Sequence, residues 1–333
     1  MRYQKLGDSG ITASVVTLGA MEAGGGFRYP KVTDDEAVRA IQTALDAGIT
    51  FIDTAPVYGF GHSEEVVARA IRGRRDKVVL STKCGLWWDD DEGTYRFTWD
   101  GHRVKRNVSA RVIKIEIEKS LKRLQTDYID VYYTHDPALP PFDTPLEETV
   151  GAMNDLLREG KIRAIGASNV VLDDVRGYVA GGSISLVQNK FNLLERGALK
   201  DVIPYCQEHH IQFHGYSTLE AGLLAGKVAR DLDASGDPAK TSPLWRQPNL
   251  ARAVDLVEGL RSDVAAPLGI GAVELAIAYS IAKGVNPICG IYRPDQVAAV
   301  ARAADVELSD ADVAEIDRRV DEFWAGADDV AVA

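Results

Sequence analysis

The stretch TDDEAVRAIQTALDAGITFID, residues 33–53, contains a helix and the strand that follows it. Thr33 and Glu36 form a capping box, which predicts that a helix starts here. Apolar residues then recur on one face with helical spacing, and Gly48 provides the stop. Residues 50–53 are typical of a short buried strand. The stretch therefore predicts one helix–strand unit of an α/β fold.

The same unit recurs along the whole chain. The expected strands cover residues 15–18, 50–53, 78–82, 128–133, 164–167, 186–189, 212–216 and 286–291, and helical patterns separate them. Eight alternations favour a closed (β/α)8 TIM barrel over an open parallel sheet, and 333 residues suffice for one barrel with long loops. Since no Pro- or Gly-rich linker interrupts the pattern, we expect a single barrel domain over residues 1–333.

Several segments lie outside the repeat. Residues 3–6 and 11–13 flank a glycine-containing turn, which predicts a β-hairpin that plugs the barrel bottom. Ser309 begins a C-terminal helical extension with one apolar face, and residues 326–333 are expected to fray. Long loops are expected at 85–108, 135–145 and 229–249. Loops that follow barrel strands lie on the active-site face.

Composition excludes several classes of function. The 38 Lys and Arg against 49 Asp and Glu give a formal charge of −11, which disfavours duplex nucleic acid as a partner. An anionic ligand would need a local basic pocket rather than a global field. Cys84, Cys206 and Cys289 are far apart and odd in number, so neither a disulfide framework nor a CxxC metal site is supported. Without an apolar signal core or a membrane-length apolar run, a cytoplasmic protein is expected.

Four titratable residues stand at consecutive strand ends. Asp53 ends the second expected strand, Lys83 follows the third and His135 follows the fourth, while Tyr58 lies in the loop after Asp53. Barrel enzymes place their reactive groups at this end of the strands, so a closed barrel would bring the four together. Burying an unpaired lysine is costly, which favours a functional role for Lys83.

This set of residues suits the reduction of a carbonyl group. A free tyrosine has a pKa of about 10, and a nearby ammonium lowers it by favouring the phenolate. A carboxylate can hold that ammonium, and a histidine opposite can bind and orient the carbonyl oxygen. The hydride would come from a bound cofactor. Taken alone, Tyr58 and His135 are more often structural; only the combination points to catalysis.

Other polar clusters carry weaker signals. His210 and His214 have a spacing that would suit a metal on a helix, and His209 is adjacent, but a strand is expected to begin between them. Residues 89–92, all acidic, are interpreted as a solvated loop rather than a cation site. Residues 24–26, all glycine, lack the Lys-Ser/Thr that follows in a phosphate loop and are interpreted as a flexible loop near the site.

Five aromatic residues share the loop after Lys83. They either pack this loop down or line a substrate pocket, and the sequence leaves both readings open. These residues are Trp87, Trp88, Tyr95, Phe97 and Trp99.

At this point the motifs resemble those of the aldo-keto reductases, of the bacterial NADP-dependent type. Residues 53–59 match that family's DTAxxYG stretch, and residues 61–65 its following helix start. Further matches occur in the same order at 81–83, 126–130, 135, 157–163, 165–169, 216–219 and 222–227. The resemblance extends from about Tyr3 to Phe323. One such motif would be weak, but this many in order are specific.

The resemblance implies a role for each matching residue. Tyr58 would be the general acid, Lys83 and Asp53 would tune it, and His135 would orient the carbonyl. The implied cofactor residues are Ser168, Asn169 and Gln188 at the nicotinamide carboxamide, Tyr216 on the nicotinamide ring, Ser217, Leu219, Gly222, Leu223 and Lys227 over the pyrophosphate, and Gly290, Arg293 and Gln296 at the adenosine phosphate.

The chain departs from the family pattern at the adenosine end. Ala299 and Val300 stand where a Glu-Asn pair is usual, and Tyr292 precedes Arg293. The resemblance therefore implies NADPH as cofactor, with NADH as a second option, and Arg293 as a cation for the 2′-phosphate. The expected substrate is a small carbonyl or alcohol compound, such as an aldehyde, ketone, sugar or polyol. No metal, nucleic acid or membrane partner is expected.

Two rival functions remain at this stage. One is a cofactor-binding regulatory or interaction subunit with little turnover, as in the potassium-channel β subunits of the same family; the intact tetrad favours an enzyme. The other is a metal-dependent barrel hydrolase, which predicts clustered histidines and aspartates at the strand ends. The sequence lacks such a cluster.

Overall fold

The computed structural model describes residues 1–25, 32–182, 184–234, 237 and 240–327. Eight parallel strands form a closed barrel in the order β10-β11-β12-β13-β3-β4-β5-β9. Their bounds are β3 Thr17–Gly19, β4 Phe51–Asp53, β5 Val79–Cys84, β9 Ile129–Thr134, β10 Ile162–Ser168, β11 Leu186–Lys190, β12 Gln212–Tyr216 and β13 Val285–Gly290. The predicted (β/α)8 barrel is confirmed.

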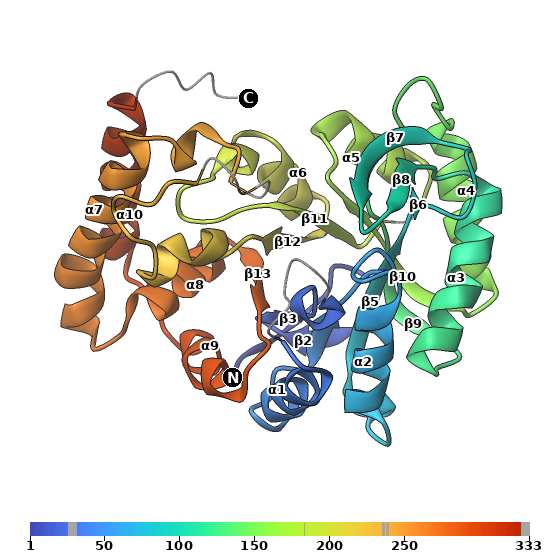
Figure 1. Ribbon diagram of the computed structural model, residues 1–333, viewed down its shortest axis with the longest axis horizontal. Coiled ribbons are helices and arrows are strands. Elements are labelled where there is room, and N and C mark those ends of the chain that lie inside the picture. Colours follow the sequence, from blue (N-terminus) through green and yellow to red (C-terminus); the bar gives the residue numbers. More distant parts are fainter. Residues whose placement is uncertain (26–31, 183, 235–236, 238–239, 328–333) are drawn as a thin grey trace.

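Helices surround this barrel (Figure 1). Those of the repeat are α1 Asp34–Asp46, α2 His62–Ile71, α3 Ala110–Leu124, α4 Leu146–Arg158, α5 Leu172–Ala180, α6 Val202–Glu208, α8 Ala272–Ala282 and α9 Val297–Ala303. The first shows why the chain folds this way: Thr33 and Glu36 form the predicted capping box, and Ala37, Ile41 and Ala44 are buried on one face. Two helices are additional, α7 Asn249–Leu260 and α10 Asp310–Ala325, which pack together.

The N-terminal hairpin closes the bottom of the barrel, as predicted. Its strands, β1 Tyr3–Lys5 and β2 Thr12–Ser14, pair antiparallel. Between them, Leu6 and Ile11 are buried in a cluster with inward-facing strand residues such as Phe51 and Tyr133. The bottom is thus filled with side chains, which leaves the opposite, C-terminal end of the strands for function.

The prediction of a loop at residues 85–108 is wrong. This segment forms a small antiparallel sheet of β6 Leu86–Trp87, β8 His102–Arg106 and β7 Thr94–Trp99, which lies near α3 and α4 (Figure 1). Asp100 and Gly101, both with positive φ, make the two-residue turn between β7 and β8. An Asp-Gly pair between strand-like runs is a known hairpin signal, and the sequence interpretation missed it.

Other boundary expectations differ less. In the residues that the structure describes, the expected loops at 135–145 and 229–249 contain no long element, and the second includes one 3₁₀ turn, Pro243–Trp245. Helix α7, which follows directly, was not expected. Ser309 caps α10 as predicted. Of the segments expected to fray or flex, residues 328–333 and Gly26 lie outside the described residues.

No helix that the structure describes is by itself long and apolar enough to cross a bilayer. One pair, bent by 82° at its break, passes on length and composition only when its two halves are taken together.

Candidate active site

A buried lysine organises the C-terminal end of the barrel. The ammonium of Lys83 lies 2.6 Å from Asp53 Oδ2 and donates to the carbonyl of Thr54 at 2.8 Å. Its third neighbour is the hydroxyl oxygen of Tyr58, at 3.4 Å. Lys83 is fully buried, and burial lowers its pKa while the charge of Asp53 opposes that shift. The ammonium is thus held between one carboxylate and one phenol.

Strand geometry explains why Lys83 points inward. Side chains alternate along a strand, so Thr82 must face the opposite way. The Thr82 hydroxyl donates to buried Glu64 of α2 at 2.7 Å, outside the barrel. Register places Asp53 beside Ser81 on the neighbouring strand, two residues before Lys83 and on the same face. Asp53 and Lys83 therefore converge inside the barrel mouth.

Close backbone packing fixes the loop that carries Tyr58. A side chain on Gly24 would begin 2.7 Å from the carbonyl carbon of Tyr58, so only glycine allows this approach. Gly59, at φ +65°, packs against Gly24 from the other side. The glycines at 24 and 25, interpreted from sequence as part of a flexible loop, thus include one that supports the Tyr58 loop directly. Ser63 adds a brace by donating to the carbonyl of Ala20 at 2.6 Å.

His135 faces Tyr58 across the mouth. Their rings meet edge to face, with centroids 5.8 Å apart. The backbone N–H of His135 donates to the carbonyl of Cys84 at 2.8 Å, which ties the histidine to the strand that carries Lys83. Burial, then the charges of Lys83 and Arg96, hold the pKa of His135 well below its usual value. The imidazole is therefore neutral near pH 7. Part of the surface of both Tyr58 and His135 remains accessible at the mouth.

Asp53 has further partners that sequence reasoning did not assign. Its Oδ1 accepts from the Ser81 hydroxyl at 2.8 Å and from Gln188 Nε2 at 3.1 Å. Gln188, expected at the nicotinamide carboxamide, thus bonds to the carboxylate of Asp53 in this structure. Ser81 stands within the Ser-Thr-Lys motif, so its position two residues before Lys83 was the available signal.

The other expected nicotinamide residues also lie at the mouth and bond to one another. Asn169, at φ +59°, donates to the carbonyl of His135 at 2.8 Å and to Asp136 at 2.9 Å. Its Oδ1 accepts from the Tyr216 hydroxyl at 2.7 Å, and Ser168 lies within 3.3 Å of its amide nitrogen. Asp136 was missed by sequence reasoning, although it directly follows His135.

The expected pyrophosphate residues share one irregular segment. It includes the 3₁₀ element Glu220–Ala225 and has positive φ at Ser217 and Gly222. Lys227 is exposed at its end. The side chain of Leu223 is buried in the core, so it offers only its backbone to a ligand.

The expected adenosine end is held mainly by contacts between residues that are close together in the sequence. Arg293 N and Tyr292 N both donate to Gln296 Oε1 at 3.0 Å, so Gln296 caps the turn Pro294–Gln296 that leads into α9. The guanidinium of Arg293 pairs with Asp295 at 3.1 Å and remains 46% exposed. Gly290 ends β13 beside the carboxylate of Glu22.

The two histidines whose spacing would suit a metal lie apart from each other. His214 is buried inside the barrel against Phe51, and burial lowers its pKa to about 3, whereas β12 begins at Gln212 between it and exposed His210. No group of three or more metal-ligating side chains occurs among the described residues.

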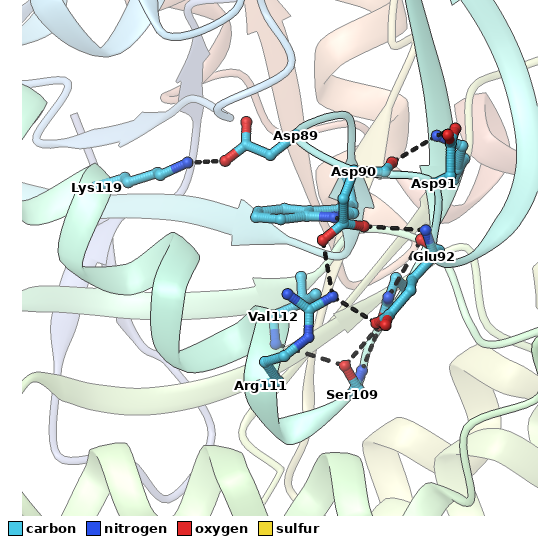
Figure 2. A network of polar contacts seen from close by, with 11 residues as sticks. Asp89, Asp90, Asp91, Glu92, Ser109, Arg111, Val112 and Lys119 are labelled. Carbon is cyan, nitrogen blue, oxygen red and sulfur yellow. Dashed lines mark hydrogen bonds and ion pairs between the residues drawn. The ribbon is translucent and has the colours of Figure 1, made fainter.

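The acidic run 89–92 pairs with basic side chains. Figure 2 shows Asp89 on Lys119, and Asp90 and Glu92 on Arg111. The run therefore fastens the small sheet to α3.

The loop aromatics pack toward Tyr58. Phe60, two residues after Tyr58, contacts Trp88 and Trp99 with ring centroids 5.2 and 5.9 Å apart. Trp88 and Phe97 also contact the apolar cluster that Tyr58 joins. Trp87 instead donates to Asp90 at the base of the sheet. Part of the aromatic set thus forms a wall next to Tyr58, and part holds the segment down.

Comparison with known proteins identifies the family. A model of the aldo/keto reductase family matches residues 15–321. The chain belongs to the aldo/keto reductase family. It is therefore an oxidoreductase, and the resemblance inferred from its motifs is confirmed.

Two similar proteins with different named activities support this assignment. The NADH-specific methylglyoxal reductase of Escherichia coli is 37% identical, over 94% of this chain and 96% of the relative. The glycerol dehydrogenase structure from Gluconobacter oxydans superposes with a TM-score of 0.82 at 31% identity, covering 97% of this chain and 95% of that one.

A third comparison includes a cofactor. An aldo-keto reductase structure from Klebsiella pneumoniae in complex with NADPH superposes with a TM-score of 0.72 at 29% identity, and covers 96% of this chain and 95% of that one.

Proposed function

We propose that this aldo/keto reductase transfers hydride between a nicotinamide cofactor and a small aldehyde or ketone, with Tyr58 as the proton donor. The observation that carries the proposal is the position of Lys83, buried between Asp53 and the Tyr58 hydroxyl. A fully buried ammonium is costly unless it has a charged partner. Placed next to a phenol, it favours the phenolate that remains after proton transfer.

The bound cofactor supplies the hydride, and the side chains handle the proton. As the carbonyl carbon accepts hydride, its oxygen becomes an alkoxide and takes the hydroxyl proton of Tyr58. The ammonium of Lys83, 3.4 Å away, stabilises the phenolate left behind. His135 is neutral, so an N–H of its imidazole can hydrogen-bond the carbonyl oxygen without competing as an acid. In alcohol oxidation each transfer runs in reverse.

The residues at the mouth suit a nicotinamide dinucleotide. Tyr216 offers a ring beside Asn169 at the catalytic end, and Lys227 and Arg293 offer cations at the other end. Lys227 and Arg293 both lower the pKa of Asp295, so these two cations lie near the same carboxylate. Cations and helix starts are suited to phosphate groups. The NADH-specific reductase of Escherichia coli and the NADPH complex from Klebsiella pneumoniae support both cofactors as candidates.

Two measurements on purified protein test this function. Saturating NADPH or NADH, without added metal, should raise the melting temperature by mass action. Consumption of either cofactor with an aldehyde should then be catalytic. If neither cofactor shifts the melting curve, the cofactor assignment is wrong. If a cofactor binds but no aldehyde, ketone or alcohol turns over, the alternative of a cofactor-binding subunit is favoured.

A further inference from the structure

Two arginines converge on one carboxylate beside His135. Arg96 Nε lies 2.8 Å from Asp136 Oδ2, and Arg106 Nε lies 2.9 Å from the same oxygen. Within the described residues, Asp136 is the carboxylate that pairs with either arginine. Two guanidinium groups therefore share one negative charge, and the cluster keeps an excess of one positive charge. In a chain with a formal charge of −11, this is a local exception.

The backbone directs Arg96 to this place. The register between β7 and β8 pairs Tyr95 with Lys105 and Phe97 with Val104, so Arg96 is the extra residue of a β-bulge. Bulges interrupt the alternation of side chains and re-aim one of them, often near active sites. Here the re-aimed side chain reaches over to the loop after β9, where Asp136 lies.

The sheet that carries these arginines is fastened at both ends. At its base, ion pairs join Asp89 to Lys119 and Arg111 to Asp90 (Figure 2). At its other side, the Thr94 hydroxyl bonds to the carbonyl of Leu139 in the loop after β9. Arg96 is therefore held by a braced sheet rather than by a loose loop.

The arginine cluster adjoins the reacting groups. Asp136 Oδ1 accepts from Asn169 at 2.9 Å, and Asn169 also bonds to the backbone of His135 and to Tyr216. The charge of Arg96 adds to the lowering of the pKa of His135 that burial and Lys83 cause, and it opposes the rise in the pKa of Tyr216 that burial causes. The positive charge thus lies within electrostatic reach of the site where the carbonyl would bind.

Exposure separates the two arginines. The side chain of Arg96 is 44% exposed, whereas that of Arg106 is 16% exposed. Arg96 contacts Asp136 through Nε, so the edge formed by its two terminal nitrogens faces away from that bond. This edge matches the two oxygens of a carboxylate or phosphate.

We propose that Arg96, supported by Arg106, binds an anionic group on the carbonyl substrate, either a carboxylate or a phosphate. This inference rests on the proposed function, because it concerns the same mouth. It narrows the substrate class to carbonyl compounds that bear a negative charge a short distance from the reacting carbon.

Matched aldehydes test the proposal. Para-formylbenzoate and its methyl ester differ in charge, while para-formylphenyl phosphate and para-methoxybenzaldehyde form the corresponding phosphate pair. For the preferred anion, kcat/KM should exceed that of its neutral counterpart by about 10-fold or more, the size of a charge-assisted contact. Arg96→Ala should remove most of this ratio, mainly through KM, and Arg96→Lys should restore part of it.

Arg103→Ala provides the control. Arg103 lies on β8 of the same sheet, is exposed, and stacks over Tyr95 rather than on Asp136. This variant should leave both ratios unchanged. If Arg96→Ala lowers the charged and neutral aldehydes equally, Arg96 only holds the sheet and the proposal is wrong. If the wild type prefers neither anion, the proposal also fails, while turnover of the neutral aldehydes would keep the proposed function intact. No turnover of any aldehyde contradicts both.

Discussion

The proposed catalytic corner, formed by Asp53, Tyr58 and Lys83, and the expected adenosine end at Arg293 use cations in opposite ways. Lys83 is fully buried, and its partners Asp53 and Tyr58 belong to a different strand and a different loop. Arg293 is half exposed, and its ion-pair partner Asp295 stands two residues away. One cation is fixed by the fold, the other by its neighbours in sequence.

The two sites differ in how firmly their charges are placed before a ligand binds. Around Lys83, Ser81 and Gln188 hold Asp53 in turn, so the charges are placed before any substrate arrives. Around Arg293, an exposed ion pair is worth little and can exchange partners with a ligand phosphate. We therefore expect changes at the catalytic corner to affect rate and stability, and changes at the adenosine end to affect cofactor choice.

Lys83→Met should have the largest effect. It removes the ammonium that stabilises the Tyr58 phenolate, so kcat should fall by about 100-fold or more. It also leaves Asp53 buried without its cation, which should lower the free energy of unfolding by about 3–5 kcal/mol. Steady-state kinetics and chemical denaturation measure the two losses. If kcat stays above about a tenth of wild type, Lys83 has only a structural role, and the proposed difference in function between Lys83 and Arg293 is wrong.

Arg293→Ala should have a smaller and selective effect. Because Arg293 is the main visible partner for a 2′-phosphate, the Kd for NADPH should rise by about 10-fold or more, with little change for NADH. Asp295→Asn is the matched opposite, since it releases the guanidinium and should tighten NADPH. Titration of each variant with both cofactors gives the Kd values. An equal loss of NADPH and NADH would place the phosphate site elsewhere.

The pH dependence of stability should differ in sign between buried Glu116 and exposed Asp295. Behind β5, burial raises the pKa of Glu116 to about 8, while its Oε2 accepts from Gly85 N at 2.6 Å. Between pH 4.5 and 8 the folded state holds this proton and the unfolded state does not, so stability falls as pH rises. The loss is at most about 1.4 kcal/mol per pH unit.

Glu116→Gln should abolish that contribution. The variant should resemble wild type near pH 5 and exceed it in stability at pH 8. At the expected adenosine end, Arg293 lowers the pKa of Asp295. Asp295 therefore makes a small contribution to stability that is lost only as pH falls. Denaturation at several pH values, with Asp295→Asn beside Glu116→Gln, measures both. Parallel pH profiles for wild type and Glu116→Gln would show that Glu116 is ionised in the fold.

Local patterns in the sequence predicted the barrel well. The strand ends at Asp53, Lys83 and His135 were predicted from the alternation of short strands and helices alone. The closed barrel brings these residues together. The prediction for residues 85–108 failed because β6 has only two residues and β7 is bulged at Arg96, so period-two alternation breaks. Only the Asp100-Gly101 turn could have revealed the hairpin.

Contacts between distant segments were beyond sequence reasoning. Gly24 was grouped with a flexible loop because nothing in its neighbourhood indicates that it packs on the backbone of Tyr58. The bonds of Gln188 to Asp53 and of Asn169 to Asp136 join residues that are 135 and 33 positions apart. Of these residues, Gln188 and Asn169 were predicted to contact the nicotinamide, and this remains a prediction.

In the proposed mechanism, Tyr58 donates the proton that completes carbonyl reduction. Stopped-flow measurement of hydride transfer by Tyr58→Phe, at saturating cofactor, tests it most directly, since the phenyl ring keeps the packing and only the hydroxyl is lost. We expect that cofactor still binds while the single-turnover rate falls by about 10²–10⁴-fold. A rate above about a tenth of wild type would show that another group protonates the alkoxide.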